Sequence, residues 1–364
     1  EVSMKPLLSR MALAPTDGNH DDTPNLNYTY HFNTDKTFNE TATVKPQFDG
    51  ITYSFVYGDA LFMVYSHQDF WRGSYSYANG TSTYLSNDVA NWFRDQVEKY
   101  PDTKWRIAAV HKNLFTGSGH QTDEDGALFR ATLLPVFQEL NIDFVIQGHD
   151  HIYEVMGPIN NTTKTIVPGS VTNVELVSPD SNKNPKGQQG GTFNVKDGTL
   201  YFVNGTCGRK RYYPYTQDEM EAGFDKHKVE GYWDLFTGKY GQPGAPAFSE
   251  ISVSSSEIEV KTYTSDANAQ ATLFDTFKIV KNGNTGIEEN KQSAKLYPTY
   301  AKDKINTTES DIIRVNAIDL TGKIYPLPFD NQHIDVSNLT DGIYVVQIFT
   351  NEKTRSERIV KTSR

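Results

Sequence analysis

The sequence lacks the features of a disulfide-stabilised or membrane-spanning protein. It has one cysteine, Cys207, among its 364 residues, so no disulfide can form within the chain. This shortage is only a weak sign of a reducing compartment, because many exported bacterial proteins also lack disulfides. The longest apolar run, at residues 60–65, is far shorter than the roughly 18 residues that a membrane helix needs. We therefore expect no transmembrane segment.

Positive charge is also scarce. The formal net charge is -10, and no run of Lys and Arg is dense enough to follow a phosphate backbone, so we expect no nucleic acid partner. A basic segment followed by an apolar one, as in a secretory signal peptide, is missing at the start, where residue 1 is Glu. We expect that processing or truncation has removed the natural N-terminus.

Strands and helices alternate over the first part of the chain. Apolar alternation over residues 50–65 predicts two paired strands with a turn at Gly58-Asp59. Helical spacing predicts helices over 86–99, capped by Ser86 or Asn87, and over 128–140, where Pro135 should break or bend the helix. Buried strands are predicted over 104–110 and 143–147. This alternation indicates an α/β layered core, and strands at 200–203, 250–263 and 272–280 could form the far side of a sandwich.

The composition changes near residue 282. Residues 282–294 are rich in Asn, Gly, Glu and Lys and are typical of a linker. Beyond them, short strands are predicted over 312–318, 334–336, 342–349 and 357–361, which gives a small all-β module. We therefore predict a catalytic domain over 1–281, a linker over 282–294 and a C-terminal domain over 295–364.

Histidines stand where the predicted strands end. His111 ends the strand at 104–110, and Gly148-His149-Asp150-His151 follows the strand at 143–147. In open α/β sheets, ligands bind beyond the carboxyl ends of the strands. Residues two apart in an extended segment point the same way, so His149 and His151 can face one site. Two further blocks complete the set, Gly18-Asn19-His20-Asp21 and His120.

These residue types suit a pair of metal ions. Imidazole nitrogens bind Zn, Fe and Mn, and the amide oxygen of Asn19 is a neutral hard donor. Two metals about 3.5–4 Å apart can clamp a phosphoryl group and activate water, and a histidine beside them can protonate the leaving group. Other histidines are better explained as surface or core residues, namely His31, His67, His227 and His333.

The order of these blocks resembles the calcineurin-like metallophosphoesterase superfamily. Several segments between these blocks are similar to sequences of its purple-acid-phosphatase-like bacterial branch, for example Tyr53-Ser54-Phe55, Lys104-Trp105-Arg106-Ile107 and residues 145–154. The resemblance covers residues 1 to about 281 and implies a four-layer α/β sandwich of two mixed β-sheets flanked by helices.

The resemblance also implies a role for each residue. Two metal ions, Fe, Zn or Mn, are expected as cofactors. The implied roles are these: Asn19, His111 and His149 bind the second metal, His151 binds the first, His20 donates the proton, His120 contacts the substrate phosphate, and the carboxylates of Asp21 and Asp150 support the ligands from behind.

One part of the family pattern is missing. In the family, two sequence blocks precede the one that begins at Gly18. The first is Asp-x-His or Asp-x-Gly, and the second is Gly-Asp-x-x-Tyr or Gly-Asp-x-x-Asn. Residues 1–17 match neither block. We therefore expect that the first β-α unit is missing and that the chain as given is poorly active. Two segments match parts of these blocks but follow Gly18 in the chain: Gly58-Asp59 matches the Gly-Asp of the second block, and Asp225-Lys226-His227 matches Asp-x-His. We interpret both segments as structural.

The C-terminal module resembles the sorting domain of the type IX secretion system of Gram-negative bacteria. The similarity lies in Leu296-Tyr297-Pro298, residues 318–323, residues 339–346 and the closing residues 358–361. It implies an immunoglobulin-like sandwich, the type IX machinery as a partner, and a secreted or cell-surface protein. The alternative is a β-module that only packs against the enzyme.

The sequence thus predicts an exported enzyme that hydrolyses phosphate monoesters of small molecules with two metal ions. Two alternatives stay open. The same site could hydrolyse phosphodiesters or nucleotides, because the loops over 70–84 and 178–191 are too irregular to indicate a substrate. The chain could also be a non-catalytic exported binding protein, since half of the expected ligands are absent.

Overall fold

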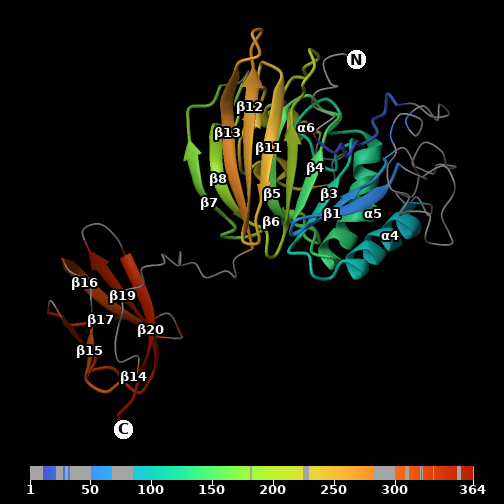
Figure 1. The fold of residues 1–364 in the computed structure, drawn as a ribbon. Helices are drawn as coiled ribbons and strands as arrows, with labels where there is room; N and C mark the ends of the chain where they lie inside the picture. Colours follow the sequence, from blue (N-terminus) through green and yellow to red (C-terminus); the bar gives the residue numbers. More distant parts are fainter. Residues whose placement is uncertain are drawn as a thin grey trace. The chain divides into compact units, whose positions relative to one another are not determined.

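A computed structural model shows two compact units, Glu1–Asn284 and Thr285–Arg364, which are described separately (Figure 1). The structure describes residues 11–21, 28, 32, 51–67, 85–180, 183–223, 229–281, 300–307, 311–319, 321, 323–330, 332–350 and 354–363. The predicted linker, 282–294, lies outside these ranges, and the predicted domain limits stay a prediction.

The larger unit contains an eight-stranded mixed sheet. Strands β1 (Tyr53–Tyr57) and β2 (Ala60–Val64) form the predicted hairpin, with Gly58 at the turn in the left-handed region at φ 57. Strands β2, β3 (Trp105–Ala109), β4 (Phe144–Gln147) and β9 (Thr199–Asn204) are parallel neighbours. The antiparallel strands that complete the sheet are β5 (Tyr153–Asn160), β6 (Thr165–Ile166) and β10 (Tyr240–Gly241).

Helices α4 (Leu85–Lys99) and α5 (Glu124–Glu139) pack against each other and cover the outer face of this sheet (Figure 1). Phe93 and Phe137 meet between them, with ring centroids 5.3 Å apart. The predicted cap of the first helix was wrong, because α4 begins at Leu85, before Ser86. Of the predicted break or bend at Pro135, the break was wrong, since α5 is continuous through this residue. Burial of the apolar face of α5 outweighs the one hydrogen bond that proline removes.

A second, five-stranded sheet packs on the inner face of the first. Its strands, in sheet order, are β11 (Ala247–Val253), β12 (Glu257–Ser265), β13 (Ala271–Val280), β8 (Gln188–Asn194) and β7 (Val171–Leu176). Phe144 and Phe202 from the first sheet meet Phe277 and Ile279 from the second in a shared core. The described residues thus show the two mixed sheets and one helical layer.

Two segments of the second sheet differ from the sequence-based prediction. Residues 250–263 form a hairpin rather than one strand, because Ser254 turns the chain: its Oγ accepts from the N–H of Glu257 at 3.0 Å. The predicted polar loop over 178–191 contains the start of β8, whose parallel pairing with β13 was not visible in its polar composition.

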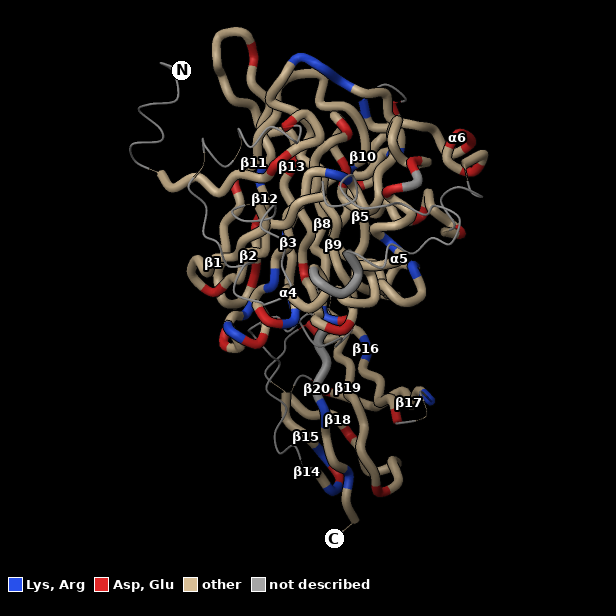
Figure 2. The backbone as a smooth tube through the Cα atoms, turned by 90° about the vertical axis from the view of Figure 1, so that its right-hand side faces the viewer, with Lys and Arg blue, Asp and Glu red and all other residues tan. Residues whose placement is uncertain are grey.

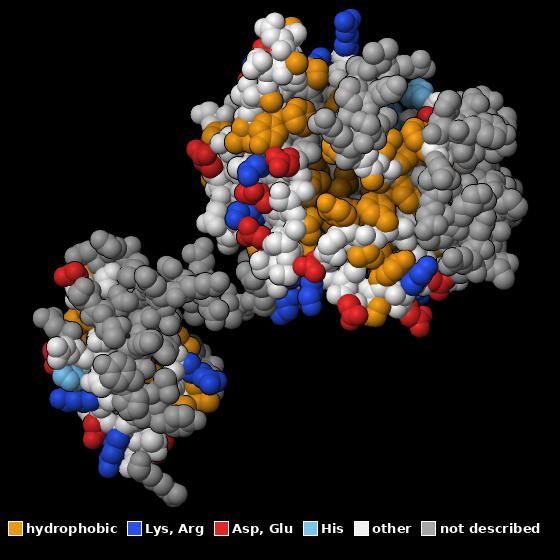
Figure 3. Space-filling view, viewed as in Figure 1, with side chains coloured by type: hydrophobic (Ala, Val, Ile, Leu, Met, Phe, Trp, Pro, Cys, Tyr) orange, Lys and Arg blue, Asp and Glu red, His pale blue; other side chains and the backbone are white. Residues whose placement is uncertain are grey.

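The surface of the larger unit carries mixed charge and one apolar face. Figure 2 shows Lys and Arg interspersed with Asp and Glu, except for the run at residues 209–211, which is a continuous basic segment. Figure 3 shows hydrophobic side chains gathered over β1 and β11. Tyr57 on β1 and Phe248 on β11 are exposed, at 75% and 43%. No helix in the described part of the chain is long and apolar enough to span a bilayer.

The smaller unit is a β-sandwich. Its five-stranded sheet has the order β14 (Tyr300–Ala301), β20 (Thr354–Lys361), β19 (Gly342–Thr350), β16 (Ile312–Asp319) and β17 (Ile324–Pro326). A second sheet pairs β15 (Lys304–Asn306) with β18 (His333–Asp335). Val346 and Ile359 are among the apolar residues buried in its core. The predicted strands are confirmed, and Leu296-Tyr297-Pro298 lies outside the described residues.

Candidate metal centre

Two strand ends bring His111 and His149 together. His111 lies two residues after β3 and His149 two residues after β4, and these strands are parallel neighbours. Two hydrogen bonds join the segments that follow β3 and β4: Val110 N donates to Ile146 O at 3.0 Å, and Gly148 N donates to His111 O at 2.9 Å. A Cβ on Gly148 would lie 3.4 Å from His111 Nδ1, so this glycine is in close contact with the His111 ring.

Three donor atoms converge at this edge. His111 Nε2 lies 2.9 Å from Asn19 Oδ1 and 3.1 Å from His149 Nδ1. Donors that share one small divalent ion at about 2.1 Å are about 3.0–3.4 Å apart, so these separations fit a common ion. His149 Nε2 is also buried without a hydrogen-bond partner in the described chain. The residues present therefore fit a metal ion.

The loop that carries Asn19 is held by its own carboxylates. Asp21 Oδ2 accepts from Gly18 N at 2.7 Å, and Asp21 N donates to Gly18 O at 2.9 Å. Asp17 Oδ2 accepts from Ser66 Oγ at 2.7 Å, which fastens the loop to the end of β2. Asp21 thus closes the turn that carries Asn19. His20 is exposed next to Asn19.

Burial keeps the two histidines of this cluster neutral. Loss of hydration lowers the pKa of His111 to about 4 and that of His149 to about 2, and neighbouring cationic groups add to the effect for His149. A neutral imidazole has the free lone pair that a metal requires.

His120 lies on the other side of His149. Their ring centroids are 3.9 Å apart, and His120 Nδ1 is hydrogen-bonded to Asp150 Oδ1 at 2.5 Å. Asp150 is fully buried, and its second oxygen accepts from Thr116 Oγ1 at 2.6 Å. The hydrogen bond to Asp150 raises the pKa of His120 against the opposing effect of burial. The hydrogen bond to Asp150 thus uses Nδ1 of His120.

Asp123 joins this side of the cluster and was missed at the sequence level. Ligand atoms of His120, Asp123 and His149 all lie within 4.8 Å of one another. Asp123 is at the N-cap position of α5, yet its side chain makes no capping hydrogen bond. Burial raises its pKa. Asp123 could have been found from its position three residues after His120, because side chains at that spacing in a turn lie close together.

His151 has a different environment. Its Nδ1 is 2.9 Å from the carbonyl oxygen of Lys210, and its ring stacks on Tyr212 with centroids 4.7 Å apart. Tyr212 in turn lies 5.3 Å from His120. The structure therefore brings His111 into contact with both Asn19 and His149, whereas His151 stacks on Tyr212, which in turn lies beside His120.

The histidines interpreted as structural fall in three places. His67 is fully buried, with its ring centroid 5.4 Å from that of His111. His333 lies in the smaller unit, 3.1 Å from Asp330. His31 and Asp225-Lys226-His227 lie outside the described residues.

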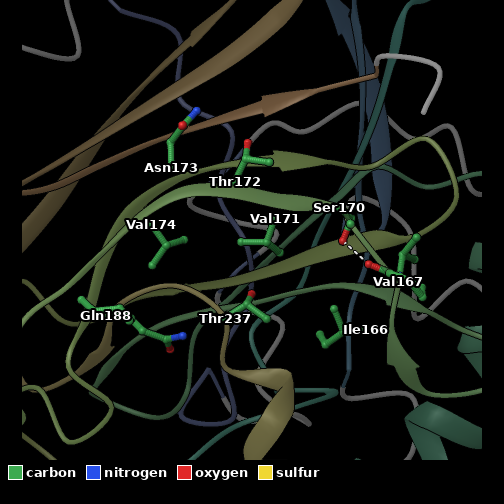
Figure 4. Close-up of a pocket in the computed structure, with 12 residues that line it drawn as sticks. Ile166, Val167, Ser170, Val171, Thr172, Asn173, Val174, Gln188 and Thr237 are labelled. Atoms are coloured by element: carbon green, nitrogen blue, oxygen red, sulfur yellow. Dashed lines mark hydrogen bonds between the residues drawn. The ribbon is translucent and has the colours of Figure 1, made fainter. Parts of the chain in front are cut away.

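A cavity of about 470 Å³ lies apart from these groups (Figure 4). Its lining comes from the segment around β6 and β7, with Gln188 of β8 and Thr237. In Figure 4, Ser170 turns its hydroxyl toward the carbonyl of Val167, at 2.6 Å. The residues that line the cavity include no titratable side chain.

Comparison with protein families gives two matches. Residues 3–153 match the calcineurin-like phosphoesterase family, and residues 295–362 match the secretion system C-terminal sorting domain. The first match contains every candidate site residue, and the second lies within the smaller unit.

Individual relatives are distant. An uncharacterized protein of Mycobacterium tuberculosis is 27% identical over 134 residues, which is 34% of this chain and 24% of that protein. Purple acid phosphatase 5 of Arabidopsis thaliana is 26% identical over 176 residues, 48% of this chain and 34% of the relative. A solved purple acid phosphatase from yellow lupin seeds is 15% identical, with a TM-score of 0.38 over 64% of this chain and 33% of that one. The chain thus spans about a quarter to a third of these curated relatives.

Proposed function

We propose that this chain, which carries a calcineurin-like phosphoesterase domain and a secretion system C-terminal sorting domain, belongs to an exported enzyme that hydrolyses phosphate monoesters with two metal ions. The observation that carries the proposal is the convergence of Asn19, His111 and His149, with 2.9 and 3.1 Å between their donor atoms.

Asn19, His111 and His149 would hold one ion. The second ion has two candidate positions: His151, as the family resemblance implies, and the group His120, Asp123 and His149, which supplies three donors within 4.8 Å. Nitrogen-rich ligands with few carboxylates favour Zn or Fe, with Mn as a further candidate. When bound, such ions polarise a phosphoryl oxygen and lower the pKa of water.

The remaining side chains have roles in proton transfer and phosphate binding. His20 is exposed beside Asn19, where it can donate a proton to a leaving alkoxide. If the second ion binds at His151 instead, His120, whose pKa Asp150 raises, can present a charged N–H to a phosphate oxygen. Asp150 positions that ring, and Asp21 positions the Asn19 loop.

The metal requirement can be tested with p-nitrophenyl phosphate. Turnover should need added Zn²⁺, Fe or Mn²⁺, stop with a chelator, and fall strongly in His20→Ala and His149→Ala. We expect weak turnover for these 364 residues, because few carboxylate ligands are present. Activity that survives both chelation and His20→Ala would rule out the mechanism.

The same assay distinguishes phosphate-monoester hydrolysis from the two alternative functions, phosphodiester hydrolysis and binding without catalysis. Faster hydrolysis of bis-p-nitrophenyl phosphate than of the monoester would identify a phosphodiesterase, and a nucleotide panel extends the comparison. A protein that binds no metal and turns over neither ester would be a binding protein.

The sorting domain supports export through the type IX secretion machinery to the medium or cell surface. In a bacterium with that machinery, removal of residues 285–364 should keep the protein inside the cell envelope. Fractionation followed by immunoblotting measures this. Export without these residues would show that the module has another role.

A further inference from the structure

A second buried carboxyl group lies behind the hydrogen bond between His120 and Asp150. Glu154 is on β5, where it pairs with Val203 of β9 on one side and Tyr240 of β10 on the other. The exposed fraction of Glu154 is 0%. A glutamate is almost never fully buried unless its carboxyl group is paired. The hydrogen bonds of this group therefore decide its charge.

Glu154 and Asp150 share one hydroxyl group. Thr116 Oγ1 lies 2.6 Å from Asp150 Oδ2 and 2.9 Å from Glu154 Oε1. A threonine hydroxyl has one proton, so it can donate to only one of the two carboxyl groups. The other carboxyl oxygen can approach the hydroxyl favourably only if it carries a proton of its own. One of the two carboxyl groups is therefore protonated.

The contacts place that proton on Glu154. Asp150 accepts from Thr116 at 2.6 Å and from His120 Nδ1 at 2.5 Å, and hydrogen bonds to a carboxylate favour its charged form. Glu154 Oε2 accepts from the neutral backbone N–H of Gly117 at 2.6 Å, which leaves Oε1 to carry the proton. Burial and the nearby charge of Asp150 both raise the pKa of Glu154 well above its usual value.

We propose that Glu154 is a neutral carboxylic acid that donates to Thr116 Oγ1. The hydroxyl of Thr116 then donates to Asp150, and Asp150 holds the ring of His120. Hydrogen bonds in such a chain polarise one another and fix the direction of each donor. Glu154 and Thr116 are thus positioning residues for His120. The charge of Glu154 needs no metal ion, and only the use of His120 at a metal or phosphate rests on the proposed function.

Infrared spectroscopy of the metal-free, 364-residue protein tests the charge of Glu154. At about pH 8, where Asp143 is ionised, the unmodified protein should have a carboxylic acid C=O band that Glu154→Gln lacks. Asp143→Asn replaces another buried acid by its amide and is the matched control, which should keep the band. No difference between the unmodified protein and Glu154→Gln in this band overturns the proposal.

Isotope labelling gives the same information without a variant. If all glutamates carry ¹³C in the side-chain carboxyl group, the C=O band of the unmodified protein should shift to lower frequency. A band that shifts only when the aspartates are labelled would place the proton on Asp150 and overturn the assignment.

Exchange of the ring Nδ1 proton of His120 with solvent, measured by NMR, tests the positioning role. Glu154→Gln can still donate to Thr116 and accept from Gly117, whereas Glu154→Met has similar volume and can do neither. Exchange should be unchanged in Glu154→Gln and about tenfold faster in Glu154→Met, as expected for the loss of one hydrogen bond. Thr116→Val, which interrupts the chain at the next group, should resemble Glu154→Met. Equal exchange in all of these proteins overturns the positioning role.

This inference and the proposed function fail differently. All of these measurements use metal-free protein, so their failure leaves the metal centre in place. Absence of zinc binding would overturn the proposed function and leave the charge of Glu154 unaffected.

Discussion

Asp150 holds His120 through a 2.5 Å hydrogen bond, and the ring so held lies 3.9 Å from that of His149, one residue before Asp150 in the chain. One short segment thus supplies both a candidate ligand and the carboxylate that orients a neighbouring histidine. Asp150 is fully buried, whereas the side chain of His120 is 30% exposed, so the carboxylate side of the hydrogen bond lies out of water, which strengthens its effect on His120.

Replacing Asp150 should change the pKa of His120. In Asp150→Asn the charged acceptor is lost, while burial still favours the neutral ring, so the pKa of His120 should fall from its raised value to below about 6.5. NMR titration of the histidine ring protons in metal-free protein measures this. His333, in the other unit, serves as the internal reference. An unchanged pKa would show that Asp150 does not control the charge of His120.

Metal binding should stabilise the larger unit. A ligand that binds only the folded state at 100 times its dissociation constant contributes about 2.7 kcal/mol. For a unit of this size, that corresponds to a rise in the melting temperature of about 4–5 °C. Calorimetry with Zn²⁺, and then with a chelator, measures the rise and its reversal. Asn19→Ala and His111→Ala should reduce the rise, and an equal rise in both variants would place the ion elsewhere.

The basic run next to His151 should assist phosphate binding. Arg209 and Lys210 are exposed, and the Lys210 ammonium lies 4.8 Å from the ring centre of Tyr212, which stacks on His151. The double variant Arg209→Ala, Lys210→Ala should weaken binding of inorganic phosphate to the zinc-loaded protein by about tenfold, as expected for two solvated charges.

Isothermal titration calorimetry measures this effect, which added salt should reduce. Lys323 is a matched control, because its ammonium lies 4.9 Å from the ring centre of Tyr325 in the smaller unit. If Lys323→Ala weakens phosphate binding as much as the double variant does, the effect is one of net charge alone.

Asp143 should make the stability of the larger unit depend on pH. Burial raises its pKa from 3.8 to about 6, although Lys281 lies 2.7 Å away and opposes the shift. The folded state therefore binds a proton more tightly than the unfolded state. The resulting stabilisation is complete below about pH 4 and is lost as the pH rises through about 6, with a total of about 3 kcal/mol.

Denaturation by urea at a series of pH values tests this, with Asp143→Asn as the reference that cannot titrate. The stability of the unmodified protein relative to Asp143→Asn should fall as the pH rises from 4 to 7. In Lys281→Met the loss should occur at higher pH, because the group that lowers the pKa of Asp143 is gone. A pH-independent difference would contradict the assignment.

The local pattern of apolar residues was sufficient to predict β3 and β4, the strands that precede His111 and His149. Each follows a short apolar run, and such a run is buried as a strand whatever lies next to it in the sheet. The amphipathic spacing over residues 86–99 likewise predicted the helix α4, in which Trp92 and Phe93 lie in the core. Local pattern was not sufficient at Pro135, where tertiary packing outweighs the helix-breaking tendency of one residue.

The sequence by itself determined which segments are strands and that a histidine follows the ends of two of them. Only the tertiary structure decided that β2 lies beside β3, which buries His67 against His111, and that the turn after His120 brings Asp123 to His149. The physical reason is that strand order and side-chain burial depend on contacts between residues far apart in the chain. The local periodicity of the sequence does not indicate which strands become neighbours in the sheet.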